Sequence, residues 1–233
     1  MATNLTDTIR HLKVFSPVKF DNTRIDVIGV GATGSRIAMA LAKLGVLNLH
    51  IWDFDKVESH NIANQIYGNN DIGKFKVDAL ADLIKAQTNL DVTKHNEAVN
   101  GRSALGSVVF LLTDTMSSRK EIWEGAIRYK PFIEVMFETR MGIDLGRTYW
   151  VRPTSPDDVK FWESTLCGDE EVVVVSACGS QITVGSTAEI VSGLAVWNFI
   201  NWFNWYSDTT NKVEQMPKET IFGVTPPAIL TRS

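Results

Sequence analysis

Apolar and polar positions alternate along the chain between short strand-like runs and helical stripes. Residues 24–45 begin with a β-branched apolar run, pass through three glycines and continue with Ile37, Leu41 and Leu44 at helical spacing. Residues 48–55 form a second apolar run. This stretch predicts a strand, a tight turn, a helix and a parallel strand, joined by a right-handed crossover.

The same alternation continues through the middle of the chain. Residues 74–88 place apolar side chains at helical spacing, and residues 107–114 form a continuous apolar run that is typical of a buried parallel strand. Residues 117–129 predict another helix with Ser117 as its N-cap, followed by a strand over 131–138.

The last third of the chain has a different pattern. Residues 141–151 predict a return strand, antiparallel to the one before it. Residues 152–171 are rich in Pro, Ser, Asp and Gly without periodicity, which predicts a surface loop. Residues 187–207 predict a long helix that is apolar on most sides, so we expect it to be buried in a monomer core or against a second copy. Residues 220–224 predict an edge strand.

These elements predict an α/β fold: a Rossmann-like, mostly parallel sheet with helices on both faces and an antiparallel C-terminal strand extension. We expect an N-terminal segment over 1–23 and a nucleotide-binding domain over 24–151. A crossover-type loop over 152–180 would then lead into a C-terminal helix and tail over 181–233 that complete the same domain.

Composition excludes several classes of protein. The 233 residues are 44% hydrophobic and 21% charged, as in ordinary soluble domains, and the net charge of -4 offers no basic face for nucleic acid. The N-terminus has no apolar signal segment, and the late apolar stretch is interrupted by Asn and Trp. We therefore expect a cytoplasmic protein without a nucleic-acid or membrane partner. Two cysteines and four dispersed histidines predict no structural zinc.

A glycine-rich turn predicts a nucleotide site. Gly29, Gly31 and Gly34 form G-x-G-x-x-G between a predicted strand and a predicted helix, where backbone N–H groups can approach a phosphate without an intervening Cβ. Asp53 follows the next strand, where its carboxylate can accept hydrogen bonds from ribose hydroxyls. Both NAD and ATP satisfy this pattern.

Further polar residues follow the predicted strand ends: Asp55, Asn61, Lys76 and Asp114. With the stretches "DFDKVESHNIANQ", "DIGKFKVDAL", "LLTDTMSSR" and "ETRMGI", this ordered set resembles the ThiF/MoeB-type adenylyltransferase family, which includes the adenylation domains of ubiquitin-activating enzymes. The resemblance covers about residues 24–151. It implies a homodimeric enzyme that uses ATP and Mg²⁺ to adenylate the C-terminal carboxylate of a small ubiquitin-like or sulfur-carrier protein or peptide, releasing pyrophosphate.

The resemblance also implies residue roles. The glycine turn and Asp53 would hold the nucleotide, with Asp55 and Asn64 beside it. Asn61 and Lys76 would act on the triphosphate, Lys76 by offsetting charge at the α-phosphorus. Asp114 would bind magnesium, and Arg119 matches the arginine that follows it in the family. The alternatives are turn stabilisation by Asp55 and Asn61, a solvated Lys76 and a surface Arg119.

One position departs from the family pattern. Asn64 stands where the family has an arginine, and an amide replaces the forked, permanently charged donors of arginine only in part. Either another cation substitutes, with Arg36, Lys74 and Arg10 as candidates, or the chain is a catalytically impaired nucleotide-binding scaffold. A third hypothesis, an NAD-dependent oxidoreductase, lacks an evident catalytic His or Tyr-Lys pair.

The two cysteines are candidate thiol nucleophiles. Cys167 lies in the irregular segment where family members that transfer the acyl group to sulfur carry their cysteine, and Cys178 precedes the long helix, where a helix N-terminus would favour a thiolate. A surface thiol at Cys167 and a buried structural cysteine at Cys178 are the alternatives.

Overall fold

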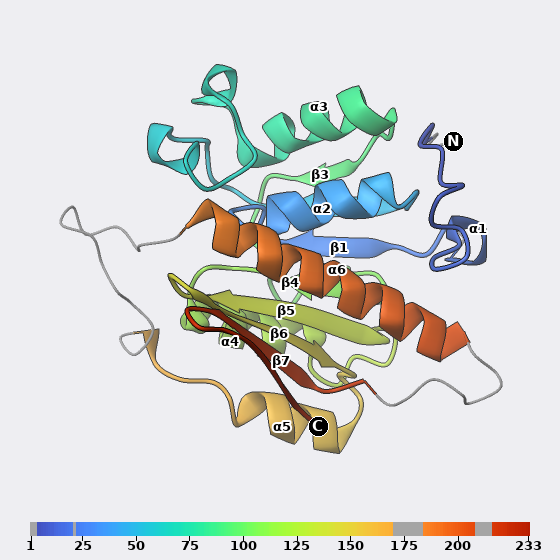
Figure 1. The fold of residues 1–233 in the computed structure, drawn as a ribbon, viewed down its shortest axis with the longest axis vertical. Coiled ribbons are helices and arrows are strands. Elements are labelled where there is room, and N and C mark those ends of the chain that lie inside the picture. Colours follow the sequence, from blue (N-terminus) through green and yellow to red (C-terminus); the bar gives the residue numbers. More distant parts are fainter. Residues whose placement is uncertain (1–3, 21, 170–183, 208–215) are drawn as a thin grey trace.

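The computed structural model describes residues 4–20, 22–169, 184–207 and 216–233. Within them the chain forms a sheet of eight strands in the order β3-β2-β1-β4-β5-β6-β7-β8, in which the first five strands are parallel and the last three antiparallel (Figure 1). The strands are β1 (Ile25–Ile28), β2 (Leu49–Trp52), β3 (Thr93–His95), β4 (Val108–Leu111), β5 (Val135–Met141), β6 (Leu145–Val151), β7 (Glu219–Val224) and β8 (Pro227–Arg232).

Helices cover both faces of the sheet, as the sequence predicts. The helices are α1 (Pro17–Phe20), α2 (Gly34–Lys43), α3 (Lys76–Thr88), α4 (Met116–Ile122), α5 (Pro156–Glu163) and α6 (Gly185–Ser207). Helices α2, α3 and α6 pack on one face, and α4 and α5 on the other (Figure 1). The Rossmann-like fold with an antiparallel C-terminal extension is therefore confirmed.

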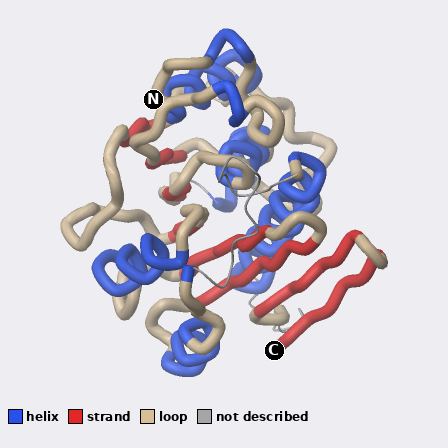
Figure 2. Tube along the Cα trace, turned by 90° about the vertical axis from the view of Figure 1, so that its left-hand side faces the viewer, coloured by secondary structure: helices blue, strands red, loops and turns tan. Residues whose placement is uncertain are grey.

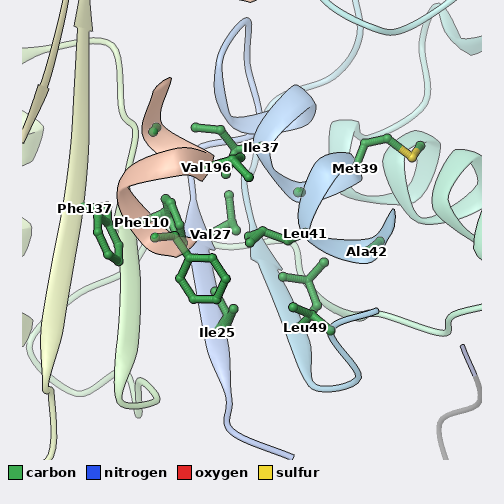
Figure 3. Packing of buried hydrophobic residues seen from close by; sticks show 14 of the residues in the cluster. Ile25, Val27, Ile37, Met39, Leu41, Ala42, Leu49, Phe110, Phe137 and Val196 are labelled. Atoms are coloured by element: carbon green, nitrogen blue, oxygen red, sulfur yellow. The ribbon is translucent and has the colours of Figure 1, made fainter. Parts of the chain in front are cut away.

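Side chains alternate across each strand and so supply two cores. Ile25 and Val27 of β1 point toward α2 and α6, together with Phe110 and Phe137 from the neighbouring strands (Figure 3). Ile28 faces the opposite way and joins the cluster beneath α4 and α5. Strands buried on both faces explain the continuous apolar runs in the sequence.

Three predictions of local structure need correction. The predicted loop contains α5, because Ser155 caps its first turn and Val159 and Trp162 bury one side of it. Helix α4 is capped by Thr115, whose side chain accepts from the N–H of Ser118, and not by Ser117. Strand β7 is an interior strand, since β8 pairs with it and forms the edge (Figure 2).

Helix α6 lies across the sheet and contacts α2, β5 and β6. It is long and rich in apolar residues, which raises the question of a membrane span. Among the described residues, however, no helix combines the length and apolar character needed to cross a bilayer.

A pair of histidines links β2 to β3. His50 and His95 approach to 3.0 Å between ring nitrogens, and the His95 ring stacks on Trp52 at 3.5 Å between centroids. Burial, reinforced by the positive charge of Arg24, lowers the pKa of His50 from 6.5 to about 4 and also lowers the pKa of His95.

The pKa of His50 is lower in the folded chain than in the unfolded chain, so the unfolded chain binds a proton at His50 at a higher pH. The free energy of unfolding should therefore fall as the pH drops from 6.5 to 4. Replacing His50 with Gln should make this fall shallower. Urea unfolding followed across that window would measure it for the natural chain and the variant. Equal slopes for the two proteins would contradict the assignment.

Candidate active site

A cavity of about 680 Å³ opens at the carboxyl ends of the parallel strands. It lies where β1 has β2 on one side and β4 on the other, and the connections leave these strands in opposite directions. Open α/β sheets bind ligands at this kind of crevice, and the volume suits a nucleotide-sized molecule.

The glycine turn forms the floor of this cavity, and its three glycines meet different constraints. Gly29 has a φ of +87°, and a Cβ on it would lie 2.8 Å from the carbonyl oxygen of Leu112. A Cβ on Gly34 would lie 1.9 Å from the Gly29 oxygen. Gly31 lines the cavity, and its nearest neighbour is a Gln65 side-chain atom 4.0 Å from the Cβ position. Gly29 and Gly34 thus shape the turn, whereas Gly31 keeps the approach to its backbone open.

Asp53 ties the end of β2 to the glycine turn. Its carboxylate accepts hydrogen bonds from the N–H groups of Val30 and Asp55, both at 2.9 Å. Burial raises the pKa of Asp53, and the nearby charge of Lys76 opposes this shift. Lys76 is almost fully buried at the start of α3, and its ammonium lies 2.8 Å from the carboxylate of Asp55. Asp53, Asp55 and Lys76 all line the cavity.

The opposite wall is a helical turn over residues 59–65 that carries Asn61 and Asn64. The Oδ1 of Asn61 accepts from the N–H of Glu58 at 2.9 Å, so this side chain stabilises the turn and also borders the cavity. Arg36 of α2 holds this turn close to the glycine turn, since it donates to the carbonyl oxygens of both Asn64 and Ala32. Asn61 therefore stabilises the turn, as the alternative expected, and its role toward the triphosphate stays a prediction.

Asp114 lies on the turn after β4, exposed to the cavity. The turn is held by Arg119, which the sequence left undecided between function and surface. Arg119 is buried and donates to the carbonyl oxygens of Thr113 and Thr139, and it forms an ion pair with Glu138 at 3.0 Å. Burial lowers the pKa of Arg119, and the Glu138 charge opposes that change. Arg119 thus positions the strand ends around Asp114.

Four acidic residues in or beside the site escaped the sequence analysis: Glu97, Glu121, Glu138 and Asp169. Glu138 is fully buried on β5 and also accepts from Arg140 and Trp162. A carboxylate inside an apolar strand was the available signal, because such a group needs buried partners. Asp169 lines the cavity and accepts from the N–H groups at the start of α4, a contact between segments far apart in the sequence.

The substitute cations proposed for the missing arginine do not line the cavity. Arg36 pairs with Glu189 at 2.7 Å, and Lys74 with Asp71 at 2.9 Å. Arg10 follows a segment that bonds to the C-terminal end of α2, whereas the cavity lies at the opposite end of that helix. Within one copy of the chain, none of the three replaces the arginine.

Cys167 is a free, partly buried thiol that also lies outside the residues lining the cavity. Its carbonyl oxygen accepts from Lys120 at 2.8 Å, which fixes this part of the chain beside α4. Cys178 falls outside the described residues, so its proposed role stays a prediction.

The fold and the position of the cavity define an α/β protein of the Rossmann-like class. The chain belongs to the ThiF family, whose family model matches residues 16–222. The predicted family membership is thus confirmed.

Named relatives agree with this membership. The chain is 26% identical over 214 residues to the adenylyltransferase and sulfurtransferase UBA4 of Candida albicans, covering 82% of this chain and 47% of that one. It is 37% identical over 73 residues to ubiquitin-like modifier-activating enzyme 5 of Caenorhabditis elegans, covering 31% and 17%. The chain therefore spans less than half the length of these two relatives.

Solved structures share the fold. Escherichia coli MccB crystallised with ATP aligns with a TM-score of 0.66 at 14% identity, covering 93% of this chain and 65% of that one. A structure of PaaA aligns with a TM-score of 0.71 at 19% identity, covering 93% and 74%. At these identities the likeness shows a shared fold alone.

The surroundings of Gly34 and Gly31 predict different effects of alanine on stability. Gly34→Ala should destabilise the chain by roughly 3 kcal/mol or more, because its Cβ would collide with the backbone of Gly29. Gly31→Ala should change stability by less than about 0.5 kcal/mol, since its Cβ would make only an ordinary contact, 4.0 Å from the Gln65 side chain. Denaturant unfolding of the two variants would test this contrast, and equal losses of stability would refute it.

Proposed function

We propose that this chain is an ATP-dependent adenylyltransferase acting on the C-terminal carboxylate of a small ubiquitin-like or sulfur-carrier protein or peptide. The observation that supports this most directly is a single cavity, in a ThiF family chain, lined by the glycine turn, Asp53, Lys76 and Asp114. An oxidoreductase would use the first two features alone. A cytoplasmic location, where ATP is available, forms part of the proposal.

In the proposed reaction an oxygen of the acceptor carboxylate attacks the α-phosphorus of ATP. The bond from that phosphorus to the bridging oxygen of the β-phosphate breaks, pyrophosphate leaves with the bonding electrons, and an acyl adenylate remains. The backbone of the glycine turn would bind phosphate oxygens, and Asp53 the ribose. Lys76 would stabilise the negative charge that develops around the α-phosphorus. Its contact with Asp55 holds the ammonium in place before the nucleotide arrives.

The residues present fit a magnesium ion held jointly with the nucleotide. Among the described residues, no group of three or more His, Cys, Asp or Glu side chains is arranged to hold a metal alone. Mg²⁺ needs less than that at phosphate sites, where one or two carboxylates suffice beside phosphate oxygens and water. Asp114 would supply that carboxylate, and the bound ion would offset charge on the phosphates.

The exposed side of α6 suits a homodimer interface. Ile190 and Trp197 lie two turns apart on one side of the helix with 44% and 53% of their surfaces exposed, while the opposite side is buried against the sheet. A second copy covering this side would account for the apolar character of α6 all the way round. The dimer is part of the proposal.

The catalytic proposal is tested by pyrophosphate–ATP exchange with a panel of synthetic peptides that end in a free carboxylate. Asp114→Asn should lower the exchange rate on the order of a hundredfold, since one transition-state contact of this kind is worth about 3 kcal/mol. Asp144→Asn is the matched control, because Asp144 lies on the β5–β6 turn and does not line the cavity. Amidated peptides should give no exchange. Undiminished exchange in Asp114→Asn would refute its role.

The dimer is tested by light scattering coupled to gel filtration. Trp197→Glu should convert the dimer to a monomer, because a buried unpaired carboxylate is costly at an apolar contact. Phe132→Glu, which alters an equally exposed aromatic residue outside α6, should leave the dimer intact. A monomeric natural chain would contradict this part of the proposal.

A further inference from the structure

The charges that line the cavity do not balance a bound triphosphate. Six carboxylates of the described residues border the cavity: Asp53, Asp55, Glu97, Asp114, Glu121 and Asp169. Among the described residues, three basic side chains border it: His60, Lys76 and Arg119. A polyphosphate entering this cavity therefore needs positive charge from the chain in addition to a divalent cation.

Two of the three basic side chains are buried and committed to other contacts. Arg119 directs its guanidinium to the carbonyl oxygens of Thr113 and Thr139 and to the buried Glu138, so it serves the wall of the cavity. Lys76 is paired with Asp55 at 2.8 Å and is the residue proposed for the α-phosphate. His60 is the exposed one of the three, and its contact with a carboxylate, Glu58 at 3.4 Å, is the longest, so it is the basic side chain that stays open to the outer phosphates.

His60 occupies a suitable position. It lies on the short 3₁₀ helix Ser59–Asn61, and its side chain is 64% exposed, with Nδ1 3.4 Å from a carboxylate oxygen of Glu58. The chain continues in helical turns, because the N–H groups of Asn64 and Gln65 both donate to the carbonyl oxygen of Asn61. His60 lies four residues before Asn64, and both residues border the cavity.

We propose that His60, as an imidazolium, supplies the positive charge to the outer phosphates that an arginine at position 64 would otherwise provide. Because both residues border one cavity, a side chain at position 60 can reach the space that an arginine at position 64 would enter. A charged imidazole N–H donates a stronger hydrogen bond to a phosphate oxygen than a neutral donor does. This inference rests on the proposed function, since it requires ATP in the cavity.

Calorimetry with ATP and with AMP, each with magnesium, tests the inference without an acceptor. His60→Ala should weaken ATP binding roughly tenfold, the effect of losing one charged hydrogen bond, and leave AMP binding unchanged. His60→Lys should keep most of the ATP affinity. Adding Asn64→Arg to His60→Ala should restore it. Lys74→Ala is the matched control, since it removes a nearby positive charge outside the cavity and should change neither ligand.

Each other outcome overturns a defined part of the argument. Equal ATP affinity in His60→Ala and the natural chain would refute the role of His60 and leave the proposed function standing. Equal losses for ATP and AMP would show that His60 supports the fold of the turn and not the outer phosphates. A natural chain that binds neither nucleotide would overturn both the inference and the proposed function.

Discussion

The site depends on how closely the turn after β1 approaches the end of β4. A Cβ on Gly29 would lie between 2.8 and 3.1 Å from backbone atoms of Leu112 and Thr113, so the contact exists only because the side chain is absent. The approach brings Asp114, which follows this contact, to the same crevice as the glycine turn. Helices α2 and α4 then leave toward opposite faces of the sheet and keep the crevice open.

A buried charge cluster keeps this arrangement in place. Glu138 is fully buried and accepts from Arg119 of α4, the helix that follows Asp114, and from Arg140 and Trp162. Burying a carboxylate is costly unless its oxygens are well bonded, and these are. Arg140 also donates to the carbonyl oxygen of Thr165, so the cavity wall and the segment that leads to Cys167 share one anchor.

The sequence predicts the fold where burial dominates local structure. The continuous apolar runs of β1 and β4 and the stripe of α2 are dictated by two-sided or one-sided burial, and all three elements form where expected. Helix α5 escaped prediction because it is short and polar, and depends on a cap and on contacts of Val159 and Trp162 with distant segments. Strand β8 is exposed along its whole length, so no burial pattern marks it.

The same division holds for the site. Asp53 and Asp114 follow buried strands, and the parallel sheet alone brings such residues to one edge. The substitute for the missing arginine could not be found in this way, because closeness in sequence does not show which side chains border the cavity. Arg36 and Lys74 are close in sequence to the motif residues, but neither lines the cavity. Each forms an ion pair elsewhere, Arg36 with Glu189 and Lys74 with Asp71. A charge acts on a ligand only where its side chain borders the space that the ligand occupies, as those of Lys76 and His60 do. That condition, which sequence spacing does not report, decides which basic residues can serve the phosphates.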